Sequence, residues 1–180
     1  MNIESLAYFL FGNNAVIGAH IKKQLKFLEE IVPPSFKQRE MDDLGCGDGK
    51  ITVLLRDIFQ PTNLRGYDVN HGLVKRACQR GIDASSCNLE ETMPSGELAV
   101  IWGVLHHLKD RESCLRKIIA NYPLVFIREP LQGSALKWLE LGNPLNKETV
   151  AGWVNEHLKD AKTLHSDNNV FIFYTAPGYH

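Results

Sequence analysis

A glycine-rich turn between an apolar strand and an amphipathic helix constrains the fold of this chain more than any other feature. Residues Asp43–Gly49 read Asp-Leu-Gly-Cys-Gly-Asp-Gly, and the helical run Lys50–Gln60 follows directly. Three glycines at alternating positions allow a ligand to approach the backbone where a β-carbon would collide with it. Because the turn joins a strand to a helix, the pattern favours a nucleotide-binding site. A tight strand–helix turn without a ligand is the alternative.

An acidic residue follows at the end of a second apolar strand, Leu64–Asp68. The Asp68 carboxylate can accept hydrogen bonds from both hydroxyls of a ribose. A helix cap is the alternative for Asp68, although Asn70 is well placed for that role. The glycines are spaced Gly-x-Gly-x-Gly, whereas a pyrophosphate-binding turn has Gly-x-Gly-x-x-Gly. The spacing therefore argues against a dinucleotide.

The hydrophobic pattern predicts five strand–helix units and a terminal hairpin, which together make a doubly wound α/β domain. We expect one domain over residues 1–180. Its N-terminal segment, residues 1–38, is expected to form a helical cap, and the helical spacing of its apolar residues ends at Pro33-Pro34. Asn70, Asp110 and Asn146 are expected to begin helices. Leu54 and Cys78 are expected to face the core. The first expected strand ends at Leu44. The others are expected at Leu64–Asp68, Ile82–Ser86, Leu98–Trp102, Leu124–Arg128, Ala161–Ser166 and Val170–Thr175, and the last two should pair antiparallel.

Composition gives no support to several other classes of protein. The net charge of −1 gives no basic field for nucleic acid or for an anionic membrane. The four cysteines show no Cys-x-x-Cys spacing and no adjacent histidine series, so neither a metal site nor a disulfide framework is expected. The N-terminus lacks a basic leader, and Leu6–Phe11 is too short to span a bilayer. We expect a cytoplasmic protein.

At this point the chain resembles a known family. Met41–Gly49 and Gly66–Asn70 look like motif I and the ribose-binding motif of the class I S-adenosylmethionine-dependent methyltransferases. Cys87–Glu90 lies where that family clasps adenine, and Leu98–Leu108 is similar to its fourth strand and the following loop. Asp42 departs from the hydrophobic residue usual before the acidic one. The resemblance implies S-adenosylmethionine as cofactor and a seven-stranded, mostly parallel sheet of order 3-2-1-4-5-7-6, with strand 7 antiparallel.

The resemblance also implies a cofactor site at the carboxyl ends of the strands, where the chain order reverses. Asp68 would hold the ribose, and Asn88 with the backbone of Leu89 would meet the adenine, although Asn88 could be an ordinary turn residue. Asp43 and Gly45 would bracket the methionine end. The expected cofactor-binding residues are Asp43, Gly45, Cys46, Gly47, Asp48, Gly49, Asp68, Val69, Asn88, Leu89 and Trp102.

Methyl transfer needs mainly alignment, with removal of a proton from some acceptors. His106, beside His107 in the loop after the fourth strand, could take a proton from a hydroxyl or an amine. Leu-His-His-Leu is common in the family even where the acceptors differ, so a structural role is the alternative. The segment around Tyr8 weakly resembles the lid of small-molecule methyltransferases, including phosphoethanolamine methyltransferases, where a tyrosine meets this histidine. Packing of aromatic residues on the sheet is the other interpretation of that segment.

His107 and Arg128 are the candidate substrate-binding residues. Arg128 could hold a carboxylate or phosphate of the acceptor, or it could form an ion pair with Glu129 on the rim. The chain is short and has no large insertion, which favours a small-molecule acceptor or a partner protein that completes the site. A homodimer is also compatible with the sequence.

These residues lead to three hypotheses for function. The first is an S-adenosylmethionine-dependent methyltransferase that acts on a small molecule. The second is a non-catalytic S-adenosylmethionine-binding subunit or regulatory partner of another protein. The third, a nicotinamide-dependent oxidoreductase, requires the third glycine one place later, and Asp48 would repel a pyrophosphate at the helix start.

Overall fold

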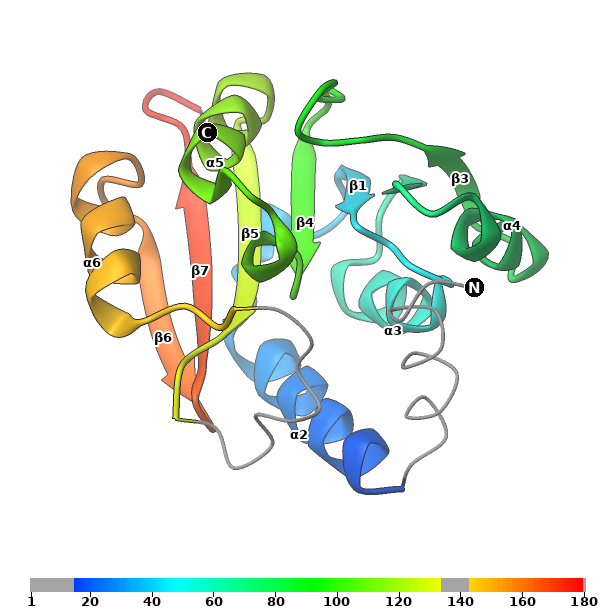
Figure 1. The fold of residues 1–180 in the computed structure, drawn as a ribbon, viewed down its shortest axis with the longest axis horizontal. Coiled ribbons are helices and arrows are strands. Elements are labelled where there is room, and N and C mark those ends of the chain that lie inside the picture. The colour runs from blue at the N-terminus through cyan, green and yellow to red at the C-terminus, as the bar shows by residue number, and fades with distance from the viewer. Residues whose placement is uncertain (1–14, 134–142, 180) are drawn as a thin grey trace.

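The computed structural model describes residues 15–133 and 143–179, which form a seven-stranded sheet with helices on both faces (Figure 1). The strand order is β3-β2-β1-β4-β5-β7-β6. Strand β7 is antiparallel to both neighbours, and the other pairs are parallel. The predicted order and the antiparallel last strand are confirmed. The strands are β1 Glu40–Leu44, β2 Asn63–Asp68, β3 Asp83–Ser86, β4 Leu98–Trp102, β5 Leu124–Pro130, β6 Lys162–Ser166 and β7 Asn169–Thr175.

Helices alternate with the parallel strands, as predicted. The α-helices are α2 Ala15–Ile31, α3 Lys50–Phe59, α4 His71–Gln79, α5 Arg111–Asn121 and α6 Lys147–Glu156, and the 3₁₀ turns are η1 Pro34–Phe36 and η2 Leu105–His107. The side chains of Asn70, Asp110 and Asn146 each accept a backbone N–H in the first turn, which confirms the three predicted caps. In the described part of the chain, no helix is both long and apolar enough to cross a membrane.

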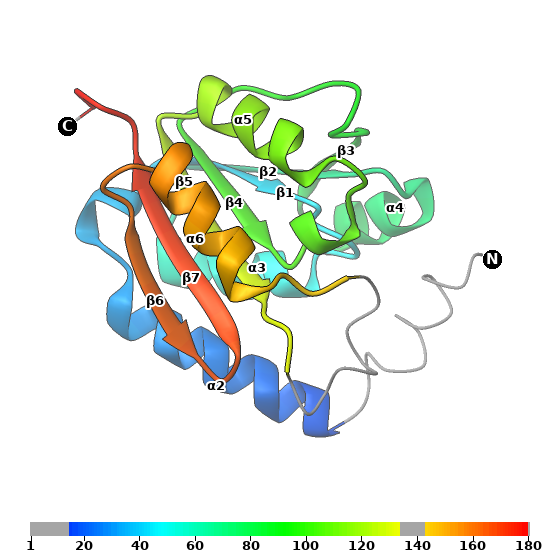
Figure 2. The same ribbon diagram turned by 60° about the vertical axis from the view of Figure 1, so that its left-hand side comes forward.

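Helices lie on both faces of the sheet (Figures 1 and 2), and each face carries its own hydrophobic core. Helices α2 and α3 pack on one face, mainly against β1, β4, β5 and β7, and α5 and α6 pack on the other. Because α3 begins directly after Gly49, its phase turns Thr52 and Leu55 toward the sheet. Leu54 is instead 41% exposed, and Cys78 on α4 is also exposed, so both were wrongly expected in the core.

Asp42, the departure from the family pattern, is buried in β1 with two partners. It lies opposite Arg65 in the register of β1 and β2, and the guanidinium binds both carboxylate oxygens at 2.7 and 2.9 Å. The Tyr122 hydroxyl donates to the same carboxylate at 2.7 Å. Burial and the adjacent Asp42 carboxylate raise the pKa of Tyr122 above its ordinary value. A carboxylate is therefore tolerated inside this strand because both of its oxygens are bonded.

Candidate functional site

The turn after β1 has the backbone that its glycines predict. The φ angles of Gly45, Gly47 and Gly49 are +88°, +55° and +79°, all in the left-handed region. A β-carbon on Gly45 would lie 2.4 Å from a methyl of Val104, and one on Gly49 would lie 3.1 Å from Ala77 Cα. At these two positions the packing of the protein's own residues requires glycine, a reason that neither ligand approach nor a tight turn supplied. The turn is thus packed against the loop after β4 and against α4.

Asp68 lies at the end of β2, next to this turn. Its Oδ2 accepts the N–H of Gly47 at 2.9 Å, and its Oδ1 accepts the N–H of Asn70 at 2.8 Å. Asn70, and not Asp68, caps α4. Each carboxylate oxygen has a second lone pair, so the half-buried side chain can still accept two hydroxyls. The geometry leaves Asp68 competent to bind a ribose.

The loop after β3 forms a turn around Asn88. The side chain of Asn88 accepts the N–H of Glu90 at 3.2 Å and donates to Glu91 at 2.8 Å. Leu89 is buried in the core, so its backbone is the part that can face a ligand. Val69, which follows Asp68, is 65% exposed. Asn88 therefore builds the local turn, and its contact with adenine stays a prediction.

Two further acidic side chains of the turn are buried. Asp43 accepts the hydroxyl of Thr52 at 2.6 Å. Burial raises the pKa of Asp43 to about 7, with a further contribution from the Asp68 carboxylate. Asp48 accepts the N–H of Lys50 and lies 3.4 Å from an Arg80 nitrogen, so it links the turn to the end of α4.

The raised pKa of Asp43 makes stability depend on pH. Its folded-state pKa of about 7 exceeds the ordinary 3.8, so its contribution is fully present below pH 3.8 and is lost as pH rises through 7. In the Asp43→Asn variant the amide oxygen still accepts from Thr52 without ionising. We expect the difference in unfolding free energy, variant minus wild type, to increase between pH 4 and pH 8 on the order of a few kcal/mol. Urea unfolding at several pH values measures it, and a constant difference would contradict the burial argument.

A carboxylate on β5, that of Glu129, binds the loop after β4. His106 is buried, and its Nδ1 lies 2.7 Å from the Glu129 carboxylate. The ring of His107 lies 4.0 Å from that of His106, with its side chain exposed. Glu129 is fully buried, whereas the alternative of a rim ion pair with Arg128 assumed an exposed Glu129. The only sequence signal that Glu129 would hold the His106 loop was its position as a carboxylate directly after the predicted, largely apolar fifth strand.

Arg128 and Trp102 end adjacent strands on the same edge of the sheet. The two residues are paired in the register of β4 and β5, and the guanidinium carbon lies 5.3 Å from the indole centroid. Arg128 is buried, and it lies close enough to Gly103 that a β-carbon there would be 3.2 Å from its Nη1. The structure thus brings Arg128, Trp102 and the His106 loop together. Tyr8 lies outside the described residues.

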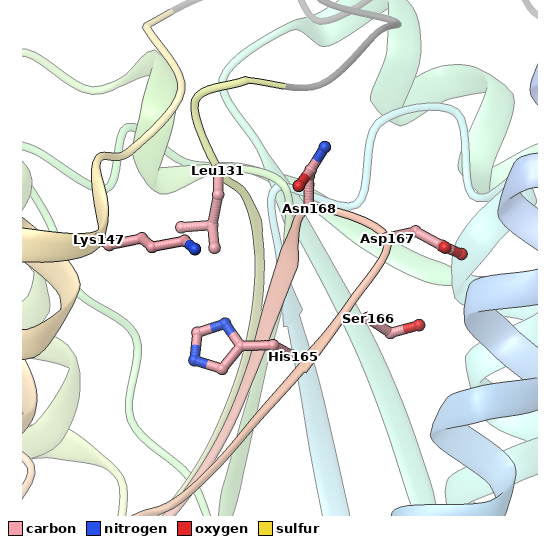
Figure 3. Close-up of a pocket in the computed structure, with 6 residues that line it drawn as sticks. All are labelled: Leu131, Lys147, His165, Ser166, Asp167 and Asn168. Atoms are coloured by element: carbon pink, nitrogen blue, oxygen red, sulfur yellow. The ribbon is translucent and has the colours of Figure 1, made fainter.

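A separate pocket of about 210 Å³ lies beside the β6–β7 hairpin (Figure 3). It contains none of the predicted site residues. Lys147 and His165 lie on one side of the hairpin, whereas Asp167 turns toward α2, where Lys23 binds it at 2.8 Å. The pocket is lined by Leu131, Lys147, His165, Ser166, Asp167 and Asn168.

Solved structures share this fold at low sequence identity. An S-adenosylmethionine-dependent methyltransferase from Thermotoga maritima, described as a possible histamine N-methyltransferase, matches with a TM-score of 0.70 and 14% identity, over 96% of this chain and 94% of that one. Magnesium protoporphyrin IX methyltransferase from Synechocystis PCC 6803, solved with bound S-adenosylhomocysteine, matches with a TM-score of 0.65 and 10% identity, over 98% and 88%. A methyltransferase from Mesorhizobium loti gives 0.62 and 14%, over 82% and 95%.

The sequence comparisons give the family. A search of curated proteins returned no match. Residues 43–120 match the family described as "Methyltransferase domain", and this range begins at Asp43 and includes the turn, the ribose motif and the His106 loop. The cofactor of the class is S-adenosylmethionine, and the predicted resemblance is confirmed. Residues 43–120 therefore belong to the methyltransferase-domain family, in a chain with the fold of the class I S-adenosylmethionine-dependent methyltransferases.

Proposed function

We propose that this protein transfers a methyl group from S-adenosylmethionine to a small-molecule acceptor. The observation that carries the proposal is the contact between the glycine turn and the ribose motif, where Asp68 accepts the N–H of Gly47 at 2.9 Å. This contact lies at the carboxyl ends of β1 and β2, beside β4, where the chain order reverses. Ligands of open α/β sheets bind at that place.

The residues of the turn fit the parts of this cofactor. Asp68 has free lone pairs for the ribose hydroxyls, and the exposed Val69 offers an apolar contact beside it. Asp43 is a buried carboxyl whose charged form a nearby ammonium would favour, as the methionine end requires. Gly45, Cys46, Gly47, Asp48 and Gly49 supply the backbone of the cradle. Asn88, Leu89 and Trp102 complete the proposed contacts.

The reaction needs few protein groups. When bound, S-adenosylmethionine supplies a methyl group whose bond to the sulfonium breaks with the electron pair staying on sulfur, while a lone pair of the acceptor forms the new bond. His106 takes the proton that a hydroxyl or amine acceptor loses, and Arg128 holds an anionic group of the acceptor. Two proteins with similar structures are named for small molecules, one as a possible histamine N-methyltransferase and the other as magnesium protoporphyrin IX methyltransferase, which supports an acceptor of this class.

Binding and turnover separate this function from its alternatives. Calorimetry with S-adenosylmethionine, S-adenosylhomocysteine and NAD should show binding of the first two ligands and none of NAD. Release of S-adenosylhomocysteine in a screen of hydroxyl and amine acceptors should then identify an acceptor. Binding without turnover on any acceptor would favour the non-catalytic subunit, and binding of NAD alone would refute the proposal.

The His106→Ala variant tests the proposed base. We expect turnover on the acceptor from the screen to fall by about 10²–10⁴-fold, the usual contribution of a positioned base, while the affinity for S-adenosylmethionine changes little. His165→Ala is the matched control, because His165 is exposed on β6 and lies in the separate pocket. An unchanged rate in His106→Ala would leave alignment of the acceptor as the whole mechanism.

A further inference from the structure

Glu129 is a buried acceptor shared by the whole His106 loop. The side chain is fully buried at the carboxyl end of β5. Its Oε1 accepts the N–H groups of Val104 and Leu105, both at 2.7 Å. Its Oε2 accepts the N–H of His106 at 3.3 Å and lies 2.7 Å from Nδ1 of the same residue. One carboxylate therefore fixes both the backbone and the ring of His106.

These four contacts determine which nitrogen of His106 carries a proton. Burial alone would raise the pKa of Glu129, but the hydrogen bonds from His106 and the loop hold it below its ordinary value. An ionised carboxylate can only accept hydrogen bonds, so the nitrogen that faces it must be a donor. In the neutral imidazole the proton is then on Nδ1, and Nε2 keeps its lone pair. The partner of one ring nitrogen selects the tautomer, as in other histidine sites.

We propose that Glu129 is the positioning residue for His106, holding the ring as its Nδ1–H tautomer so that Nε2 is the nitrogen that takes a proton from the acceptor. This inference rests on the proposed function for its chemical use, but the tautomer itself is a property of the free protein. It also narrows the acceptor to a molecule with an ionisable O–H or N–H at the reacting atom. The proton passes from that atom to Nε2, and the Nδ1–H···Glu129 bond stabilises the imidazolium that results.

The Glu129→Gln variant separates orientation of the ring from support of the loop. The amide oxygen can still accept from Val104 and Leu105, but the amide nitrogen then faces Nδ1 as a donor and can no longer accept the backbone N–H of His106. Nδ1 must lose its proton to accept that bond, and the proton moves to Nε2. The substitution is nearly isosteric, so the ring stays in place while the base is blocked. The loop loses its charge-assisted bonds but not its shape.

Two-bond ¹H–¹⁵N correlation spectra of the ¹⁵N-labelled full chain at pH 8 read the tautomer directly. In the wild type we expect the Nδ1 of His106 at the protonated position and Nε2 at the unprotonated one, and in Glu129→Gln we expect the two to exchange. Glu97→Gln is the matched control, because Glu97 also accepts a backbone N–H and side-chain donors but lies before β4, at the opposite edge of the sheet. The control should keep the wild-type pattern.

The wild-type spectrum tests which ring nitrogen of His106 carries the proton, even if the variant does not fold. A wild-type His106 with the proton on Nε2 would overturn the inference, as would an unchanged tautomer in folded Glu129→Gln. Turnover on the acceptor from the screen adds an independent test, because Glu129→Gln should lower the rate at least tenfold in the wild type and less than about twofold in His106→Ala. Equal losses in both backgrounds would mean a purely structural role. If calorimetry detects no S-adenosylmethionine binding, the proposed function fails while the tautomer result stands.

Discussion

The Asp68→Ala variant should lose roughly tens-fold in affinity for S-adenosylmethionine, measured by calorimetry. A charge-assisted hydrogen bond contributes about 1.5–3 kcal/mol, and the variant removes the acceptor of the ribose hydroxyls, which then bond in part to water. It also removes the acceptor for the N–H groups of Gly47 and Asn70. Both N–H groups lie beside a half-buried side chain, so water can replace the carboxylate and the fold should persist.

A carboxylate elsewhere provides the comparison for this variant. Asp57 lies on the exposed side of α3, and only a 3.8 Å contact with Arg56 engages it among the described residues. Asp57→Ala should bind S-adenosylmethionine like the wild type. Unchanged affinity in Asp68→Ala, with an unchanged circular dichroism spectrum, would remove Asp68 from the ribose site.

The Arg65→Met variant should be destabilised by about 3–5 kcal/mol, because it leaves the buried Asp42 carboxylate without its cation. Asp42 is 1% exposed, and after the substitution only the Tyr122 hydroxyl donates to it among the described side chains. Urea unfolding followed by fluorescence or circular dichroism gives the free energy. The loss exceeds that of an exposed ion pair because water cannot reach the carboxylate.

A second substitution tests this explanation of the loss. In the Asp42→Asn/Arg65→Met double variant the buried group is neutral, so we expect much of the stability to return. Arg56→Met, which removes an exposed arginine, should change stability by less than about 0.5 kcal/mol. If Arg65→Met alone behaves like Arg56→Met, the Asp42–Arg65 pair does not contribute to holding β1 and β2 together.

The fold was predictable because its signals are local. Strands β4 and β7 are short apolar runs bounded by turn residues, and the caps Asn70, Asp110 and Asn146 are side chains that satisfy N–H groups two or three residues away. The short polar joint before β7 predicted an antiparallel pair. The strand order came from the family resemblance, since local pattern alone does not say which strands are neighbours.

The predicted burial was wrong for residues whose surroundings depend on other parts of the chain. Leu54 was placed in the core because it is apolar, but the starting point of α3 after Gly49 turns it outward. Glu129 was placed on the rim because it is charged and follows a strand. It is buried because the loop after β4 brings three backbone N–H groups and an imidazole to it. No periodicity in the sequence encodes that convergence.

The order of residues Asp43–Gly49 and the acid at Asp68 by themselves predicted a nucleotide site, because left-handed backbone and ribose recognition each demand particular residue types. Only the tertiary structure decided what those residues touch. It showed that Gly45 makes room for Val104 and that the Glu129 carboxylate lies 2.7 Å from Nδ1 of His106. The physical reason is that residue type limits local conformation, whereas burial and hydrogen-bond partners depend on segments far apart in the chain.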